Sequence, residues 1–380
     1  MLTAKLFPMF KIFLISSLLI LQGCLFYQKI TIKGKNGLVL EQVDFQSLDG
    51  WESDDHKKAL QAFIQSCNKF SKMAQNRSVG GQISDIKISD FRDVCDIANI
   101  VKGMSESQAK NFFENWFKPF AVSNNSKGSK GLFTGYYEAS LKGSKIKTEK
   151  FQYPIYARPK DLTSDPYLTR KEIEDGALEG KGLELLYVDS KAELFSMHIQ
   201  GSGRVELTNG TVLRVAFAGR NNLPFTGVGL YMVEKGYINR SSLNAQSIKE
   251  WLDNNPDKAE EVMNVNNAYT FFKIADGEYV VGGQGVPLTA ERSLAVDSEV
   301  IPYGFPLWLD TTLTKKGNSK EKYSHLFVAQ DTGTAIKGTV RGDIFFGYGD
   351  DAEERASYMA SQGKYYILLP INMVDKMRGI

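Results

Sequence analysis

The chain has 380 residues, of which 42% are hydrophobic and 24% are charged, and its formal net charge is +2. These proportions are those of an ordinary globular protein, and the length suits two domains. A nearly balanced charge leaves no excess of Lys and Arg to replace counterions on a phosphate backbone, so we expect no nucleic-acid partner.

Residues 1–23 have the pattern of a signal peptide. Lys5 and Lys11 supply the positive charge, and the apolar run over residues 12–21 is about ten residues long. Such a run is too short to cross the ~30 Å hydrocarbon layer of a bilayer as a helix. Removal of this segment takes away two lysines and no acid, which brings the formal net charge of the remaining chain to zero.

The end of this segment, residues 21–24, resembles the lipobox of bacterial lipoproteins. Gly23 is a small residue directly before Cys24, at the end of the short apolar run. In this interpretation Cys24 becomes the acylated first residue, and two or three acyl chains anchor it to a membrane. Because Leu25 rather than aspartate follows, lipoprotein sorting favours the periplasmic face of the outer membrane. An uncleaved anchor or a buried cysteine is the alternative.

Three helices are predicted near the start of the remaining chain. Apolar residues recur at helical spacing over 53–75 and 90–102. A third helix begins at the capping box that opens at Ser105, and it is expected to continue through Phe117 until Pro119 stops it.

Two cysteines besides Cys24, namely Cys67 and Cys95, lie on the apolar faces of the first two helices. They form either a disulfide in an oxidising compartment or two buried thiols, and the sequence does not choose. The histidines are scattered along the chain, and no CxxC or HExxH spacing occurs. We therefore expect neither a metal site nor a cofactor.

The pattern changes after a polar loop predicted at 123–131. From there, short apolar or alternating runs are bounded by Gly, Asn and Pro, which predicts strands. These runs are 131–138, 153–157, 183–188, 192–200 and 212–218. The dipeptide Asn209-Gly210 predicts a hairpin between 204–207 and 212–215.

Helices are expected to interrupt these strands after Thr169 and at 247–254. Strands return from 268 to 380, with a helical stretch near 352–361. The fold class predicted from this order is mainly β, closed into barrels, with an α-helical lead-in.

Three aspartates, Asp297, Asp331 and Asp343, each adjoin an apolar run or a glycine turn. Desolvation and neighbouring carboxylates raise the pKa of an acid, as a general acid near neutral pH requires. Taken singly, an aspartate in a turn usually bonds its own backbone. We favour this structural role for Asp297, whereas for Asp331 the structural and the catalytic role are equally open. Lys337 and Arg341 either hold these acids or are solvated.

These aspartates, in this order, resemble a three-aspartate (3D) domain. A longer set of motifs is similar to the membrane-bound lytic murein transglycosylase A family. The matching segments are 133–138, 153–156, 200–203, 267–272, 285–293, 331–333 and 338–343. Together they extend over about 130–370, whereas 25–125 carries little of the resemblance. Thr334 departs from it, since the family often has a glycine there.

The resemblance implies a double-psi β-barrel and a smaller inserted β-barrel with a groove between them. After the signal peptide at 1–23, residues 24–140 would supply a helical segment and the first part of the larger barrel. Residues 141–265 would form the inserted barrel. Residues 266–380 would form the double-psi barrel, or 3D domain, with the catalytic aspartate.

The resemblance also implies a reaction on the glycan strands of peptidoglycan. The β-1,4 bond between N-acetylmuramic acid and N-acetylglucosamine is cleaved without water, because the muramoyl C6 hydroxyl attacks its own C1. One carboxyl can then serve as acid and afterwards as base, whereas ordinary glycosidases need two. Asp343 would be that carboxyl, Asp331 its tuning neighbour and Asp297 a structural residue.

The residues implied to line the groove are Thr134, Gly135, Tyr136, Tyr137, Gln200, Gly201, Ser202 and Lys337. Aromatic faces, amides and hydroxyls suit sugars, although a tyrosine taken singly is more often a packing residue. The resemblance is to an exo-acting lytic transglycosylase, while the sequence leaves endo or exo action and any partners in a cell-wall synthesis complex open.

Two other functions compete with this hypothesis. The segment Asp331-Thr-Gly looks locally like an aspartic protease. Such an enzyme needs two of these loops or a homodimer, whereas this chain has one loop and is far too long for the dimeric type. A non-catalytic peptidoglycan-binding lipoprotein would use the same groove to hold glycan without turning it over.

Overall fold

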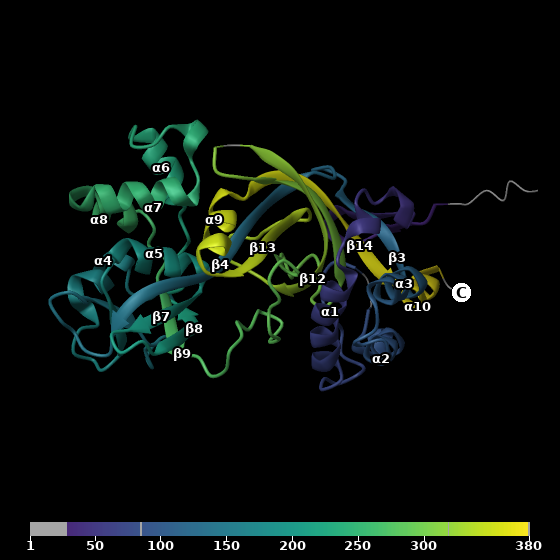
Figure 1. Cartoon of the computed structure of the whole chain (residues 1–380), viewed down its shortest axis with the longest axis horizontal. Coiled ribbons are helices and arrows are strands. Elements are labelled where there is room, and N and C mark those ends of the chain that lie inside the picture. Colours follow the sequence, from purple (N-terminus) through teal and green to yellow (C-terminus); the bar gives the residue numbers. More distant parts are fainter. Residues whose placement is uncertain (1–28, 84–85, 318, 379–380) are drawn as a thin grey trace, which may run out of the picture.

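The structure is a computed structural model that describes residues 29–83, 86–317 and 319–378. The expected signal peptide and Cys24 lie outside these residues. Figure 1 shows two parts side by side, both crossed by the long strand β4 (Gly131–Ser144). In the described part of the chain, no helix combines the length and apolar character needed to cross a membrane.

The helical lead-in is confirmed as α1 (His56–Phe70), α2 (Arg92–Ile100) and α3 (Glu106–Trp116). The predicted capping box is present, because the Ser105 hydroxyl accepts from Gln108 N and the Gln108 side chain accepts from Ser105 N. A disulfide joins Cys67 of α1 to Cys95 of α2, which settles the alternative that the sequence left open.

The predicted end of the third helix was wrong. The helix ends at Trp116, and Phe117 begins strand β3 (Phe117–Asn124), which contains Pro119. Phe117 is fully buried and contacts the rings of Phe63, Phe112 and Phe113. Strand β3 lies between two neighbours, so this aromatic packing and the sheet override the local helical pattern. Most of the expected loop remains, between Asn124 and Gly131.

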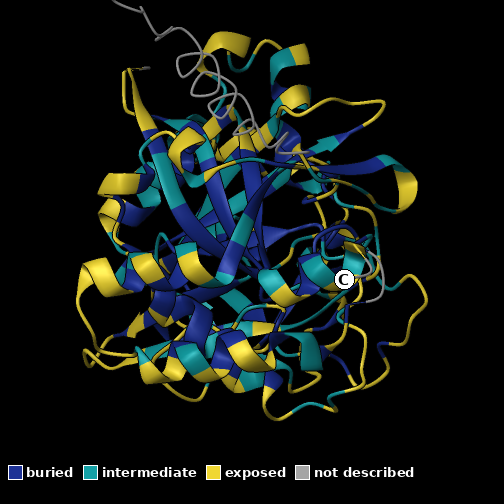
Figure 2. Cartoon of the chain, turned by 90° about the vertical axis from the view of Figure 1, so that its right-hand side faces the viewer, coloured by how far each residue is buried: buried dark blue, intermediate teal, exposed yellow. Residues whose placement is uncertain are grey.

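Six strands pair in a closed order: β14–β11–β12–β10–β13–β4, and β4 returns to β14. The bounds of the C-terminal members are β10 (Ser293–Val296), β11 (Pro306–Thr314), β12 (Lys320–Asp331), β13 (Arg341–Tyr348) and β14 (Ala360–Pro370). We call this set the strand ring. Figure 2 shows buried strands in the middle of the molecule, with helices around them whose outer faces are exposed.

Three N-terminal strands are attached to the strand ring through β14. Strand β3 pairs with β14, β2 (Leu38–Gln42) pairs with β3, and β1 (Thr31–Lys33) pairs with β2. Short helical turns connect the N-terminal elements, at Lys35–Gly37, Phe45–Ser47, Trp51–Ser53 and Ile88–Phe91.

The second half of β4 leaves the strand ring and pairs with another set of strands, which we call the second sheet. Its members are β5 (Tyr153–Tyr156), β6 (Glu184–Val188), β7 (Ser202–Leu207), β8 (Val212–Arg220) and β9 (Thr270–Ile274). The hairpin predicted at Asn209-Gly210 is confirmed, with Gly210 at a positive φ of 81° between β7 and β8. A bridge between Ala157 and Phe272 links the two edges of this sheet.

The strand predicted at 192–200 was wrong, because this segment is the helix α5 (Lys191–Gln200). A short apolar run suits a buried strand and a buried helix equally well. The helix signals flank the run: the Ser190 hydroxyl accepts from Glu193 N, and Gly201 ends the helix with a φ of 85°.

The second part of the molecule is also more helical than predicted. Helices follow Thr169 (α4, Arg170–Glu172, continued by Ile173–Ala177) and occupy Ala245–Asn254 (α7), as predicted. Helices α6 (Val228–Glu234) and α8 (Pro256–Asn264) and a turn at Arg240–Ser242 were not predicted. The predicted helix near 352–361 is α9 (Asp350–Tyr358), but 371–378 forms α10 (Ile371–Arg378) instead of strand.

Candidate active site

Two of the three aspartates lie on either side of one small residue of the strand ring. In β10, Ala295 is opposite Asp331 of β12 on one side and opposite Asp343 of β13 on the other. Asp343 is in turn opposite Thr134 of β4. Residues directly opposite each other on paired strands share a face, so these side chains form one row. Ala295 therefore lies between Asp331 and Asp343 in this row.

Asp343 has a threonine hydroxyl and an arginine as neighbours. Thr134 Oγ1 donates to Asp343 Oδ1 over 2.5 Å, and Arg341 Nη2 donates to the same Thr134 oxygen over 2.8 Å. Burial raises the pKa of Asp343, the charge of Arg341 and the bond from Thr134 oppose that rise, and Asp331 adds to it. The balance is a raised pKa, which is the property that a general acid needs.

Asp331 accepts three hydrogen bonds. Tyr136 Oη donates to Oδ2 over 2.7 Å, and the backbone N–H groups of Gly283 and Thr332 donate to Oδ1 over 2.7 and 2.8 Å. Burial raises the pKa of Asp331, and these donors oppose the rise because they stabilise the carboxylate. Burial and the adjacent Asp331 raise the pKa of Tyr136 well above its usual range, so this phenol stays protonated and can donate.

Asp297 and Lys337 lie apart from this row and bind each other. Asp297 Oδ2 accepts from Gly338 N over 2.8 Å, and Lys337 Nζ lies 3.4 Å from Asp297 Oδ1 and from Glu299 Oε1. Asp297 thus ties the loop between β12 and β13 to the end of β10. A structural role for Asp297 stays a prediction.

Tyr136 and Tyr137 face opposite sides of β4. Tyr137 is buried, with 3% of its surface exposed, and the structure does not bring its side chain to the carboxylates. Its backbone N–H donates to Gln200 Oε1 over 3.1 Å, at the end of α5. Gly201 then ends that helix, and Ser202 begins β7 and is buried. Gln200, Gly201 and Ser202 therefore form the junction between α5 and β7, beside β4.

Gly135 lies against the aromatic side chain of Phe346, on strand β13. A Cβ at this position would come within 2.5 Å of the Phe346 ring and 2.9 Å of the Ala356 backbone. Glycine is therefore required here for the close packing of α9 on β4.

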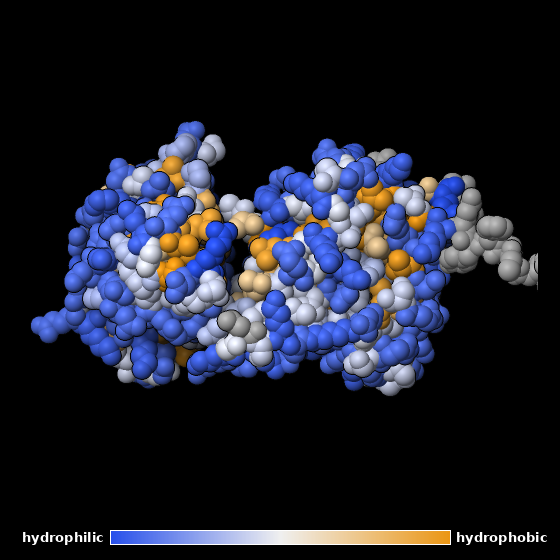
Figure 3. All heavy atoms as spheres, turned by 90° about the horizontal axis from the view of Figure 1, so that it is seen from above, coloured by the Kyte–Doolittle hydropathy of each residue, from blue (hydrophilic) through white to orange (hydrophobic). Residues whose placement is uncertain are grey.

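The carboxylate row lies near the boundary between the strand ring and the second sheet. Arg220, at the end of β8, donates through Nη1 to Thr334, three residues after Asp331. Near the same boundary, the buried Glu138 accepts from Arg204 and Arg214 of the second sheet, each over 2.7 Å. Figure 3 shows the surface narrowing between the two parts of the molecule.

Several of these contacts escaped the sequence interpretation. Arg341 remained an open alternative, and the backbone donor Gly283 was not considered. The pair Gly282-Gly283 was a usable signal, because adjacent glycines permit close approach of a backbone. Arg220 carried no comparable signal, since its contact with Thr334 joins residues 114 positions apart.

Two segments of this chain match models of known protein domains. Residues 132–273 match the MltA specific insert domain, and residues 292–369 match the 3D domain. The membrane-bound lytic murein transglycosylase A of Vibrio cholerae is 32% identical over 62% of this chain. That match extends over 65% of the Vibrio protein, slightly less than two thirds of its length.

Solved structures match over a longer stretch. The crystal structure of MltA from Neisseria gonorrhoeae, in its monoclinic form, has a TM-score of 0.74 and 34% identity. That match covers 90% of this chain and 94% of the Neisseria chain. The structure of Escherichia coli MltA with bound chitohexaose has a TM-score of 0.67 and 25% identity, and covers 82% of this chain and 90% of that one. This chain belongs to the membrane-bound lytic murein transglycosylase A family, and it carries the family's insert domain and a 3D domain.

Proposed function

We propose that this protein is a lytic transglycosylase of peptidoglycan. Its substrate is the β-1,4 bond between N-acetylmuramic acid and N-acetylglucosamine, and its product carries a 1,6-anhydromuramic acid end. The family supports the reaction class, and the chitohexaose bound to the Escherichia coli relative supports a β-linked amino-sugar chain as ligand. The observation that carries the proposal is the row in which Thr134 holds Asp343 beside Asp331.

Asp343 acts alone as acid and base in this mechanism. It first protonates the oxygen of the departing sugar, and its carboxylate then takes the proton of the muramoyl C6 hydroxyl as that oxygen attacks C1. Burial supports the first step, because a raised pKa keeps Asp343 protonated to higher pH. The second step restores the proton, so the enzyme ends each cycle in its starting state.

Asp331 is the electrostatic neighbour in this mechanism and not a second catalyst. Its two oxygens already accept from Tyr136, Gly283 and Thr332. Donors of this kind favour an anion, which carries no proton to give. An anion across Ala295 also opposes the ionisation of Asp343. The different hydrogen-bond partners of the two acids therefore support unequal roles for them.

The finer architecture is proposed on the same basis. The strand ring would be the double-psi β-barrel, formed by part of 24–140 and by 266–380, and the second sheet would be the smaller inserted barrel within 141–265. Glycan would lie between them, against Thr134, Tyr136 and the segment Gln200–Ser202, where β4 passes from one to the other. The lipid on Cys24 would hold the enzyme at the periplasmic face of the outer membrane, beside the murein layer.

Digestion of purified sacculi tests the proposed function. The full chain should release muropeptides whose mass is lower by one water than that of the hydrolysed products. The Asp343→Asn variant should bind sacculi but release no muropeptides. Products with a reducing end would make the protein a hydrolase. Binding without any release by the unaltered protein would favour the non-catalytic lipoprotein, and peptide cleavage that pepstatin blocks would favour a protease.

A further inference from the structure

Strand β12 contains one extra residue just before Asp331. Along the parallel pair with β10, Leu294 is opposite Ala329, but the next residue, Ala295, is opposite Asp331. Gln330 is therefore the additional residue of a β-bulge. If the two strands paired regularly, without a bulge, Gln330 would be opposite Ala295 and Asp331 would be opposite Val296. The side chain of Val296 points to the other face of β10, because successive residues of a strand alternate between the two faces. The bulge is thus what places Asp331 in the row with Asp343.

The Gln330 side chain is fully buried, and its amide is hydrogen-bonded at both ends. Its Nε2 donates to Ala62 O over 2.8 Å and to Ser66 Oγ over 2.9 Å, both on α1. Its Oε1 accepts from Ser293 Oγ over 2.6 Å, on β10. Loss of all these bonds would leave the buried Gln330 amide without partners, which is costly. Helix α1 and strand β10 thus hold the bulge from two directions.

The same helix also holds the turn that supplies a donor to Asp331. Ser66 Oγ donates to Gln284 Oε1 over 2.8 Å, and Gln284 N donates to Gln330 O over 3.0 Å. Gln284 directly follows Gly283, whose N–H points at Asp331 Oδ1. The turn is tight, because a Cβ on Gly283 would lie 2.5 Å from Tyr303 Oη.

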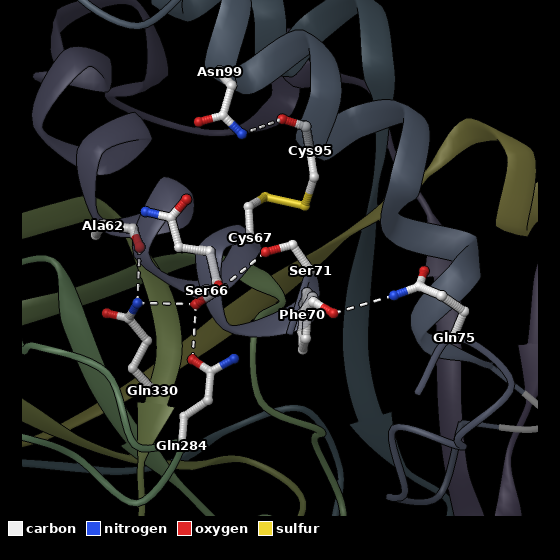
Figure 4. The surroundings of a disulfide bond; sticks show 11 residues. Ala62, Ser66, Cys67, Phe70, Ser71, Gln75, Cys95, Asn99, Gln284 and Gln330 are labelled. Atoms are coloured by element: carbon white, nitrogen blue, oxygen red, sulfur yellow. Dashed lines mark hydrogen bonds between the residues drawn. A yellow bond between two sulfur atoms is a disulfide. The ribbon is translucent and has the colours of Figure 1, made fainter. Parts of the chain in front are cut away.

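Helix α1 is itself fixed next to this contact. Cys67, the neighbour of Ser66, is joined to Cys95 of α2, and Figure 4 shows Ser66 reaching both Gln284 and Gln330 beside that disulfide. Helix α1, which is cross-linked to α2, therefore defines where the two glutamines lie. We call Ser66, Gln284 and Gln330 the glutamine relay.

We propose that the glutamine relay positions Asp331. Helix α1, which carries Ser66, would then determine where the Asp331 carboxylate lies relative to Asp343. Gln330 keeps the bulge that turns Asp331 into the row, and Ser66 with Gln284 keeps the Gly283 N–H on its carboxylate. None of the three is placed against substrate, so each is a positioning residue. This inference rests on the proposed function, because it assigns these residues a part in the same reaction.

The relay has a consequence for the charge of Asp331. The ionisable groups that face Asp331 are Tyr136 of β4, Tyr303 after β10 and Asp343 of β13, with Arg341 beyond Asp343. Within the part of the chain that the structure describes, none of the groups adjacent to Asp331 is a cation, so the N–H donors of Gly283 and Thr332 and the Tyr136 hydroxyl are what favour its anion. Losing the Gly283 donor would raise the pKa of Asp331.

Three variants test the relay on purified soluble glycan strands. Gln284→Met removes only the acceptor for Ser66, since Gln284 Nε2 has no partner among the described residues. Ser66→Ala removes both hydrogen bonds of the Ser66 hydroxyl but leaves the bond from Gln330 Nε2 to Ala62 O, and Ser66→Thr restores a hydroxyl. We expect kcat to fall roughly 10- to 100-fold for the first two with KM nearly unchanged, because the carboxylates are misplaced and not the glycan site. Ser66→Thr should recover most of kcat.

The pH profile separates positioning from simple loss of stability. In Gln284→Met and Ser66→Ala, the acidic limb of kcat should move to higher pH, because Asp331 then takes up its proton more readily. Thr311→Val is the matched control: it deletes one buried hydroxyl that donates to Gln362 O, elsewhere in the strand ring. The control should keep both kcat and the profile.

The outcomes of this experiment are distinct from those of the sacculus digestion. If the unaltered protein forms no anhydro ends, the proposed function fails. If it does form them, and folded Gln284→Met and Ser66→Ala keep the kcat and profile of the unaltered protein, the relay alone is overturned. An equal loss of kcat in Thr311→Val would also overturn it, since that result would reflect stability only.

Discussion

The hydroxyl of Thr134 donates a hydrogen bond to Asp343 across the β4–β13 pair, although 209 positions separate the two residues in the chain. This contact joins the matched insert segment, which includes β4, to the 3D segment. The acid proposed for catalysis is therefore oriented by a strand that lies far from it in sequence.

Loss of the Thr134 hydroxyl should impair Asp343 directly. In Thr134→Val the β-branched shape is kept, but the 2.5 Å bond to Asp343 and the bond from Arg341 are lost. A hydrogen bond to a charged group contributes about 1.5–3 kcal/mol, so activity should fall by roughly ten- to a hundredfold. The basic limb of the pH–activity profile should move to higher pH, because loss of the donor that stabilised the Asp343 carboxylate raises the pKa of Asp343. Thr134→Ser should retain most activity, and an unchanged Thr134→Val enzyme would contradict the role given to this contact.

Removal of the Asp343 charge should stabilise the fold while it abolishes turnover. The pKa of Asp343 is raised in the folded protein, so the folded state holds this proton more tightly than the unfolded state. Stability from this group is therefore present at low pH and declines as pH rises from the unfolded pKa through the folded pKa. Asp343→Asn should be more stable than the unaltered protein at neutral pH and equal to it below about pH 3.

Urea unfolding at a series of pH values measures this difference. Each tenfold change in the dissociation constant of an acid corresponds to about 1.4 kcal/mol. Lys337→Met serves as the comparison, since Lys337 lies outside the carboxylate row and pairs with Asp297. A stability difference between Asp343→Asn and the unaltered protein that does not vary with pH would contradict the assignment.

The Glu138 cluster should contribute strongly to the stability of the junction between the strand ring and the second sheet. Glu138 is 1% exposed and pairs with Arg204 and Arg214, and Arg204 also stacks on Tyr348 of β13 at 3.7 Å. Glu138→Gln leaves the two arginines without their counterion, which costs about 3–5 kcal/mol when the pair is buried.

The matched control for this cluster is an exposed ion pair. Glu179→Gln breaks the pair with Lys147, whose two side chains are both more than half exposed, and it should change the unfolding midpoint little. Equal midpoints for Glu138→Gln and Glu179→Gln in urea would show that the cluster does not stabilise the junction.

The disulfide between α1 and α2 should stabilise the helical lead-in. It closes a segment with a sequence separation of 28. In the chain-entropy description a loop of this length gives about 3–4 kcal/mol at 25 °C, because the cross-link restricts the unfolded chain. The double variant Cys67→Ala/Cys95→Ala should lose about this amount in urea unfolding. Addition of a reductant should reproduce the loss in the unaltered protein and leave the double variant unaffected.

Replacement of Cys24 should separate anchoring from activity. Cys24→Ser removes the proposed lipid attachment site, while the residues of the carboxylate row are untouched. The variant should be recovered in the soluble fraction after cell fractionation and should still release muropeptides from sacculi. Retention of Cys24→Ser in the membrane fraction would contradict anchoring through this cysteine.

The helices and hairpin that the sequence predicted correctly are those with strong local signals. The capping box at Ser105 and the Asn209-Gly210 turn both depend on neighbouring residues, so they could be identified without the fold. The errors occurred where the burial of side chains determined whether a segment forms a helix or a strand. The apolar run of α5 suits either a helix or a strand, and Phe117 left the helical pattern because aromatic packing and two neighbouring strands stabilise β3.

The candidate site divides in the same way. The sequence by itself determined the family, the three aspartates and the expectation that Asp343 is the acid, because these follow from ordered motifs. Only the tertiary structure decided that Asp331 and Asp343 share a row across Ala295, that Gln330 is the bulge residue behind it, and that Asp297 holds a loop instead. The physical reason is that strand register and hydrogen-bond partners arise from pairing between distant segments. No local pattern specifies which of two adjacent residues, Gln330 or Asp331, comes opposite Ala295.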